Sequence, residues 1–477
     1  MSARVEKCFR AGPTQEFPHA RAGNPAILFA FGDPSTMPPA TTHTRSRILA
    51  LASGVLLLVA LASCGGHKYT TGPDIHGVTK ASLDSGLLDE VAVLPQPGVD
   101  IEQLAADFGA TVKPGSNSIC VRFLPQAGET PAQLATRLMA DSRVVVAEQN
   151  AIIETAEARQ ESYASDDGNG SLESTVEQPA MEAIGLTAAH DVSTGRGIKV
   201  AIIDTGIDRT HPLFQGRIAG GVDYVTYDYD PTDVADGIDS DGDGQIDEAW
   251  GHGTHVAGLV AIAAPAAQLL IARVLDSDGR GDVAAVTAGL RWSLDHGARV
   301  INMSLGMLNP SLCIETLLTQ AQANGVVVVC SAGNWGAEDP QEYPAVSPNV
   351  IAVAATDAYA HPAPFTSYGD FVTLGAPGVA VRSAYPGGGW RLWSGTSMST
   401  PLVAGTAALL LSVHPDWHRN EVIARLAAHT EAITCESPSQ LGKLGDGMLM
   451  AGAALAPDFH DAPPVADGDP SPRLKRQ

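Results

Sequence analysis

Uninterrupted apolar runs recur from about residue 178 onward, without the polar alternation of a half-exposed strand. They are KVAIID (199–204), LLIARVLD (269–276), RVINMSLG (299–306), VVVVCSAGN (326–334) and VIAVAATD (350–357). Such runs are typical of strands buried on both faces, as in a parallel sheet covered by helices. Between two of them, apolar residues in 283–294 recur at helical spacing. We therefore predict a doubly wound α/β domain over residues 178–456.

A smaller pattern precedes this domain, over residues 87–155. EVAVLPQP, SICVRFLP and VVVAEQNAIIE indicate strands, and VDIEQLAADFGA and TPAQLATRLMAD indicate helices. This order favours a compact α+β unit of ferredoxin-like type. Residues 156–177 are polar and poor in core residues, so we expect an exposed linker that is open to proteolysis.

The N-terminal part contains a membrane-like segment, RSRILALASGVLLLVALASCGG (45–66). Two arginines precede an apolar run that is short for a bilayer span, as in a signal peptide. The run ends in LASC, which resembles the lipobox of bacterial lipoproteins and implies lipid attachment at Cys64. An ordinary signal peptide with a nearby cysteine is the alternative. We expect residues 37–64 to be this signal, with residues 1–36 a non-native extension and residues 65–86 a polar spacer.

The net charge and the composition limit the classes of binding partner that the sequence suggests. The net charge of −24 argues against a nucleic-acid partner, which would need basic clusters, and fits an exported protein that binds cations. Six cysteines are too few for a disulfide-dense scaffold. Residues 457–477 are rich in Pro and Asp, and we expect a disordered tail.

Candidate chemistry gathers where the predicted strands end and two helices begin. Asp204 ends one apolar run, Asn334 ends another, His252 opens GHGTHVAGLVAIAA, and Ser397 lies in SGTSMSTP just before LVAGTAALLL. In open α/β sheets, ligands bind at the carboxyl edge of the strands. If these ends converge, they supply a hydroxyl, an imidazole, a carboxylate and an oxyanion donor, as acyl transfer requires. Taken singly, each residue could equally serve a turn or a helix start.

Two other hydrolase classes fit less well. His255 follows His252 by one helical turn, but a zinc-protease helix needs H-E-x-x-H, with a glutamate that HGTH lacks. Ser399 stands where the G-x-S-x-G elbow of an α/β-hydrolase requires glycine. The motifs therefore disfavour both a zinc protease and an α/β-hydrolase esterase.

The segments VAIIDTGID, GHGTHVAG and SGTSMSTPLVAG resemble the three signature segments of the subtilisin-like serine proteases (subtilases), in the same chain order. The resemblance covers residues 178 to about 455. It implies a secreted serine endopeptidase in which Ser397 is the nucleophile, His252 the general base and Asp204 the group that orients it. It also implies that the Asn334 side chain stabilises the oxyanion.

The same resemblance implies residues that bind an extended peptide by backbone pairing. These cleft residues are Ser304, Leu305, Gly306, Ala332 and Gly333. Glu342 falls near the base of the family's first specificity pocket, where a carboxylate would favour Lys or Arg before the cut. A solvated surface glutamate is the alternative for Glu342.

An acidic loop, DGIDSDGDGQIDE (236–248), resembles the first part of an EF-hand calcium loop. The predicted ligands of a structural calcium ion are Asp239, Asp241, Asp243 and Asp247. The loop departs from the EF-hand at its twelfth position, where Trp250 replaces the bidentate glutamate. A solvated acidic loop without a metal is the alternative.

The unit at 87–155 resembles the propeptides of subtilases in position and element order, which implies an intramolecular inhibitor. Combined with the lipobox, this suggests a precursor anchored to a bacterial membrane, whose catalytic domain is released by self-cleavage in the linker. A catalytically silent lipoprotein that keeps the fold is the main alternative, and a non-proteolytic acyl hydrolase is another.

Overall fold

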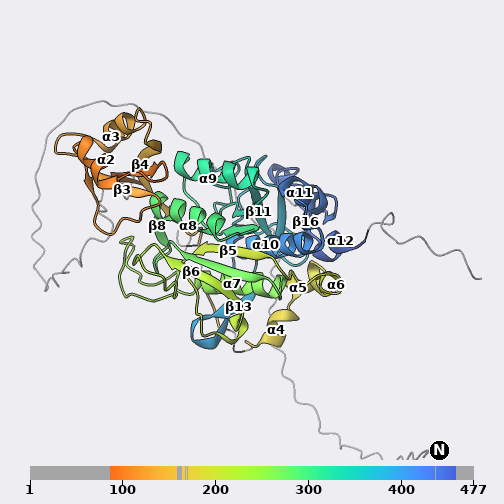
Figure 1. Cartoon of the computed structure of the whole chain (residues 1–477). Helices are drawn as coiled ribbons and strands as arrows, with labels where there is room; N and C mark the ends of the chain where they lie inside the picture. The colour runs from red at the N-terminus through yellow and green to blue at the C-terminus, as the bar shows by residue number, and fades with distance from the viewer. Residues whose placement is uncertain (1–85, 158–163, 167, 169, 436, 458–477) are drawn as a thin grey trace, which may run out of the picture. The chain divides into compact units, whose positions relative to one another are not determined.

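A nine-stranded sheet carries the larger part of the structure (Figure 1). The computed structural model describes residues 86–157, 164–166, 168, 170–435 and 437–457. The strand order is β15-β16-β12-β11-β10-β9-β5-β7-β6, and all neighbours run parallel except β15 and β16. The strands are β5 (Lys199–Asp204), β6 (Ile218–Asp223), β7 (Gln268–Arg273), β9 (Val300–Met303), β10 (Val327–Ser331), β11 (Ile351–Thr356), β12 (Leu374–Pro377), β15 (Thr430–Glu431) and β16 (Met448–Leu449).

Helices cover both faces of this sheet, so the predicted doubly wound α/β architecture is confirmed. Val200 and Ile202 of β5 pack in one core with α7 (His252–Ala263) and α10 (Thr396–Val413). Ala201 and Ile203 point to the other face, into a core with α8 (Val283–Asp295) and α9 (Leu312–Ala323). Because successive strand residues point to opposite faces, one apolar run serves both cores.

Helix α10 is long and apolar enough to cross a membrane, but 89% of its apolar window is buried inside the protein. Its length and composition are therefore explained by its place in the core beneath β9, β10 and β11.

The smaller unit precedes the large sheet in the chain and contains a βαββαβ sequence of elements. These are β1 (Leu87–Pro95), α2 (Ile101–Asp107), β2 (Thr111–Val112), β3 (Val121–Leu124), α3 (Pro131–Leu138) and β4 (Val144–Glu154). Its strands pair antiparallel in the order β2-β3-β1-β4, as in the predicted ferredoxin-like arrangement. The short strand β2 was not individually predicted.

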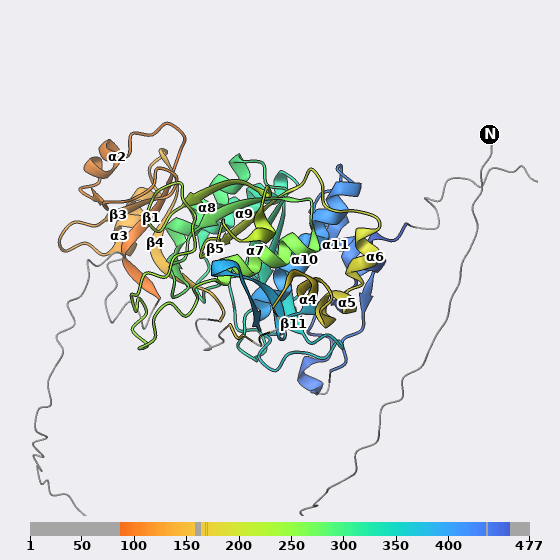
Figure 2. The same ribbon diagram turned by 90° about the horizontal axis from the view of Figure 1, so that it is seen from below.

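Strand β4 joins the two parts. It pairs antiparallel with β8 (Arg280–Asp282), and it lies over α8 and α9 (Figure 2). Glu148 accepts hydrogen bonds from Ser311 Oγ at 2.6 Å and from the backbone N–H of Leu312 and Cys313 at 2.9 Å each. This carboxylate therefore satisfies free N–H groups at the start of α9, where the helix dipole favours negative charge.

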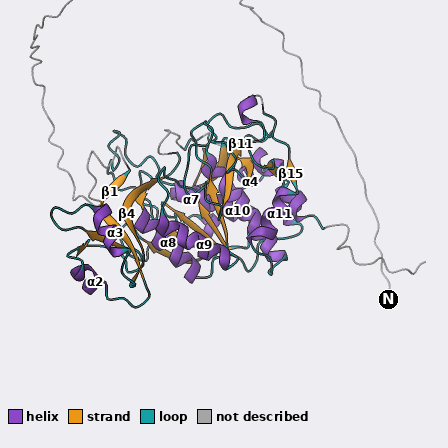
Figure 3. Ribbon diagram, turned by 90° about the horizontal axis from the view of Figure 1, so that it is seen from above, coloured by secondary structure: helices purple, strands orange, loops and turns teal. Residues whose placement is uncertain are grey.

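The remaining elements lie around the large sheet, where Figure 3 distinguishes helices from strands. They are α4 (Leu172–Val176), α5 (Pro179–Ala183), α6 (Leu186–His190), the 3-10 turns η2 (Pro212–Phe214), η3 (Pro386–Gly388) and η4 (Pro438–Gln440), the hairpin β13 (Val381–Tyr385) and β14 (Gly389–Trp393), α11 (Arg419–Ala427) and α12 (Ala451–Leu455).

The predicted linker at 156–177 differs in part from the structure. Glu157 is 2% exposed, and α4 forms within the segment with Thr175 buried against the protein. The composition of the segment gave no sign of the Glu157 contacts, because they are made with residues far along the chain. The predictions for residues 1–36, 37–64 with Cys64, 65–85 and 458–477 lie outside the described residues.

Candidate active site

The end of β5 and the start of α7 bring Asp204 and His252 together. The Nδ1 atom of His252 lies 2.7 Å from Oδ1 of Asp204, and both side chains are buried. Asp204 Oδ1 also accepts the backbone N–H of Thr205 at 2.8 Å. A carboxylate held in this way fixes the orientation and tautomer of the imidazole, as in an acid–base pair.

Ser397 lies in the first turn of α10, and its hydroxyl reaches the same place. Ser397 Oγ donates to Oε2 of Glu157 at 2.5 Å, and His252 Nε2 lies 3.2 Å from that oxygen. A hydroxyl and an imidazole that both contact one oxygen atom lie in the same small space. The structure therefore brings Ser397 and His252, the predicted nucleophile and base, to the same place.

Asn334 follows β10, and its side-chain amide also contacts the carboxylate of Glu157. Its Nδ2 donates to Oε1 of Glu157 at 3.1 Å. Its Oδ1 accepts the backbone N–H and the hydroxyl of Thr396, each at 2.9 Å, which fixes the amide orientation. The amide N–H therefore points toward the oxygen atoms bound in the centre, as an oxyanion donor must.

Glu157 was not predicted as a site residue. Its two carboxylate oxygens contact Ser397, His252 and Asn334, and its side chain is fully buried there. In the sequence it is one glutamate at the start of a polar stretch. The one sequence feature that would place Glu157 near the cleft is its position three residues after the end of β4. Where that position lies depends on how the unit at 87–155 packs against the large sheet and its helices.

Two carboxylates flank the imidazole of His252. Burial opposes a charge on the ring, but Asp204 and Glu157 outweigh that effect and raise the pKa of His252 to about 10. Burial disfavours ionised Glu157 as well, but hydrogen bonds from His252, Ser397 and Asn334 hold its pKa below the usual value. At neutral pH the centre therefore holds an imidazolium between two carboxylates.

The pKa of His255, one turn further along α7, shifts in the opposite direction. Burial lowers its pKa to about 3, so it is neutral at physiological pH. Its Nε2 lies 3.1 Å from the carbonyl oxygen of Arg391. It therefore packs as a structural side chain beside Trp393 rather than as a second base.

The predicted cleft residues Ser304, Leu305, Gly306, Ala332 and Gly333 are placed next to this centre, where β9 and β10 end. The last residue of β4 pairs with one of them, Gly306. Glu154 and Gly306 exchange backbone hydrogen bonds of 3.1 and 2.8 Å, and Thr155 N donates to Gly279 O at 2.9 Å. Gly279 was not predicted, because its loop carries no side chain that suggests peptide binding.

Comparison with known proteins agrees with this geometry. The family model described as "Subtilase family" matches residues 195–449. The chain belongs to the subtilase family. Subtilisin BL of Lederbergia lenta is 38% identical over 290 residues, which cover 59% of this chain and 96% of that protein. Subtilisin NAT of Bacillus subtilis subsp. natto is 38% identical over 265 residues, which cover 53% of this chain and 64% of that protein.

Among solved structures, the crystal structure of fervidolysin from Fervidobacterium pennivorans is similar, with a TM-score of 0.59 and 26% sequence identity. That protein is described as a keratinolytic enzyme related to subtilisin, and the match covers 77% of this chain and 60% of the other. By family, the chain is therefore a subtilisin-like serine protease and a serine endopeptidase.

In this subtilase, Glu342 is buried against the cleft. It is 2% exposed, and a Cβ built on Gly306 would lie 1.8 Å from its Oε1. A Cβ on Gly333 would lie 3.2 Å from its Cγ, and Trp335 Nε1 donates to its Oε2 at 2.7 Å. The carboxylate therefore lies between the two cleft segments, and the alternative of a solvated surface glutamate is wrong.

The acidic loop of this subtilase brings three of the four predicted metal ligands together. Carboxylate oxygens of Asp239, Asp241 and Asp243 lie within 4.8 Å of one another. Asp247 instead accepts the backbone N–H of Asp236 at 2.8 Å and of Gly237 at 3.1 Å, so it closes the loop.

Further carboxylates adjoin this loop. Burial and the charges of Asp278 and Asp241 raise the pKa of Glu248 to about 8. Burial and the charges of Asp243 and Asp278 raise that of Asp241 to about 6. Both oxygens of Glu248 are buried without a hydrogen-bond partner among the described residues. An all-oxygen set of this kind, crowded with negative charge, fits a hard cation such as calcium.

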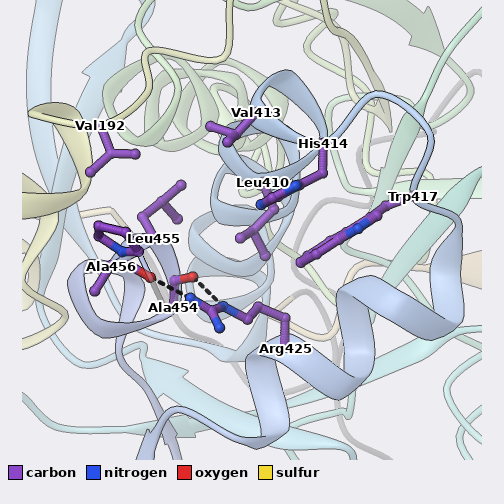
Figure 4. Close-up of a pocket in the computed structure, with 10 residues that line it drawn as sticks. Val192, Leu410, Val413, His414, Trp417, Arg425, Ala454, Leu455 and Ala456 are labelled. Carbon is purple, nitrogen blue, oxygen red and sulfur yellow. Dashed lines mark hydrogen bonds between the residues drawn. The ribbon is translucent and has the colours of Figure 1, made fainter. Parts of the chain in front are cut away.

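A separate hollow of about 370 Å³ lies at the far end of α10 (Figure 4). Leu410 and Trp417 line it, and Arg425 at its edge donates to the carbonyl oxygens of Ala454 and Ala456. These hydrogen bonds of Arg425 connect α11 to the end of α12. None of the candidate catalytic residues lines this hollow.

Proposed function

We propose that the chain is the precursor of a secreted serine endopeptidase that works through an acyl-enzyme. Ser397 attacks the scissile carbonyl, His252 accepts its proton and later passes it to the leaving amine, and Asp204 orients and stabilises the imidazolium. Asn334 Nδ2 and the backbone N–H of Ser397 hold the oxyanion. The observation that supports this most strongly is the single carboxylate oxygen that both Ser397 Oγ and His252 Nε2 contact.

The proposed substrates are extended peptides. The backbone bonds that Gly306 and Gly279 make with residues 154 and 155 support this, because a substrate strand would use the same donors and acceptors. We propose Ser304, Leu305, Gly306, Ala332 and Gly333 as the substrate-binding set.

We also propose that residues 87–155 form a propeptide that inhibits the enzyme from within the chain. Its last strand leads directly into the cleft, and its Glu148 caps α9, which supports tight docking. Self-cleavage near the start of residues 156–177 would then separate it from the catalytic domain at 178–456. With residues 37–64 as signal and Cys64 lipidated, the cut would release the enzyme from a bacterial membrane.

The decisive experiment compares the native chain with Ser397→Ala. The native protein is expected to hydrolyse casein and to react covalently with a serine-directed fluorophosphonate. Loss of the nucleophile should reduce turnover by about 10⁴-fold or more and abolish labelling. Intact labelling of the variant would refute the role of Ser397.

Two alternative functions are separated by the same assay. A catalytically silent binding lipoprotein would show neither labelling nor proteolysis in the native form. A non-proteolytic acyl hydrolase would label and cleave small esters but leave casein intact.

The membrane proposal is tested at the N-terminus of the mature enzyme. Mass spectrometry is expected to find acyl-modified Cys64 in the precursor and a mature protein that begins after residue 155. A mature active enzyme that still carries acylated Cys64 in the same chain would contradict release by self-cleavage.

The position of Glu342 supports a preference for Lys or Arg before the scissile bond. We expect Glu342→Gln to lower kcat/KM for such peptides by about 10- to 100-fold relative to peptides with Leu there, because a charged hydrogen bond is lost. Peptide-library profiling measures the ratio directly. A native profile without basic preference would end this proposal.

We propose a structural calcium ion at Asp239, Asp241 and Asp243. Asp247, the fourth ligand predicted from the sequence, is committed to backbone N–H groups in this loop. A bound cation would offset the mutual repulsion of these carboxylates and stabilise the loop that leads to His252.

Chelation is expected to lower the melting temperature by several degrees, since a ligand at about 100 times its Kd contributes about 2.7 kcal/mol. Calcium should restore the melting temperature of the native protein and of the control Asp416→Asn, an exposed residue elsewhere, but not of Asp241→Asn. Equal melting temperatures with calcium and with chelator, together with no binding heat in calorimetry, would remove the metal site.

A further inference from the structure

The carboxylate of Glu157 contacts three groups that have three different tasks in the proposed reaction. Oε2 lies 2.5 Å from the hydroxyl of Ser397 and 3.2 Å from Nε2 of His252, and Oε1 lies 3.1 Å from Nδ2 of Asn334. We propose that the Glu157 side chain is an intramolecular inhibitor that keeps the precursor inactive by occupying the place of the substrate carbonyl. This inference rests on the proposed function and adds to it the group that blocks the site.

Glu157 lies close to the backbone of α10 where that helix begins. A Cβ built on Gly395 would lie 1.7 Å from Glu157 Oε1, so the carboxylate lies directly against the backbone before Ser397. A substrate carbonyl must approach Ser397 Oγ and place its oxygen near Asn334 Nδ2. Glu157 already holds both positions, so a peptide can react only after this side chain has moved out.

The contact also disables the nucleophile chemically. Ser397 donates its hydroxyl proton to Glu157, so the proton is not directed at the imidazole. The ionisable groups that face His252 are Asp204 at the end of β5, Glu157, and His255 on its own helix. The two carboxylates favour the imidazolium, and His255 is neutral, so His252 has no free lone pair to accept a proton.

Blocking by Glu157 is separable from docking of the small unit. Docking is carried by Glu148 at the start of α9, by the pairing of β4 with β8 and by the backbone pairing of Glu154 with Gly306. None of these contacts involves Ser397, His252 or Asn334. Removal of the Glu157 carboxylate should therefore unblock the centre while the unit remains bound.

The test measures fluorophosphonate labelling of Ser397 in the intact, unprocessed full chain, resolved by mass from any cleaved product. Glu157→Gln and Glu157→Ala are expected to label roughly 10- to 100-fold faster than the native precursor, the range for loss of a buried charged hydrogen bond. The matched control is Glu102→Gln, an exposed glutamate in the first turn of α2, which should label at the native rate.

A pH profile distinguishes blocking from loosened docking. In the native precursor, labelling should rise only as the pH approaches about 10, where His252 loses its proton. Without the Glu157 charge, the imidazole has one carboxylate partner fewer, so the midpoint should move to lower pH. Glu148→Gln, which weakens docking alone, should change the rate without moving the midpoint.

Equal labelling of the native and Glu157→Gln precursors would overturn the inference, as would a Glu157→Gln profile that matches Glu148→Gln. If the glutamine and alanine variants fail to fold, Glu157→Asp serves instead, and its shorter carboxylate should label at a rate above the native one. Native chains that are processed to begin after residue 157, and therefore lack Glu157, provide the reference. If they too fail to label, the proposed protease function itself is wrong, whereas labelling of processed chains alone leaves that function intact.

Discussion

The contact between Asp204 and His252 depends on how closely the start of α7 can approach the end of β5. Gly253 makes this approach possible, because a Cβ at that position would lie 2.3 Å from the carbonyl oxygen of Gly206 and 3.1 Å from Asp204 Oδ1. Any larger residue would push the helix away and separate the imidazole from its carboxylate. The acid–base pair is thus a consequence of backbone packing at one sheet edge, and the other candidate groups are arranged around it.

The protonation of His252 depends on whether the Glu157 carboxylate is beside it. With Glu157 present, His252 lies between two carboxylates and its charged form is favoured. Without Glu157, Asp204 remains as the carboxylate in contact with the ring. The second oxygen of Asp204 is buried with no hydrogen-bond partner among the described residues. A charge that appears on His252 during the reaction would meet a carboxylate that is incompletely solvated and therefore strongly stabilising. The carboxylate of Asp204 thus favours the charged imidazole both in the blocked precursor and in the reaction intermediate.

The sequence predicted those parts of the site that are set by local structure. Asp204, Asn334, His252 and Ser397 each end a strand or begin a helix, and parallel strands bring such ends to one edge. Glu157 could not be found in this way, because its position depends on the docking of β4 against β8 and α9. Asp247 illustrates the same limit, since its turn directs the carboxylate to backbone N–H groups instead of toward the other aspartates.

Register explains why one glutamate can reach the centre at all. Strand β4 ends at Glu154, and Ala156 and Glu157 lie in a turn, so this turn and not a continued strand brings the Glu157 carboxylate to Ser397. The backbone pairing of Glu154 with Gly306 fixes where that turn begins, and the Glu148 cap on α9 fixes β4 six residues earlier. A slip of one residue in the pairing of Glu154 with Gly306 would shift this turn along the cleft, and a neighbouring alanine would take the place of Glu157. The backbone pairing of Glu154 with Gly306, next to the turn, therefore determines which side chain enters the catalytic centre.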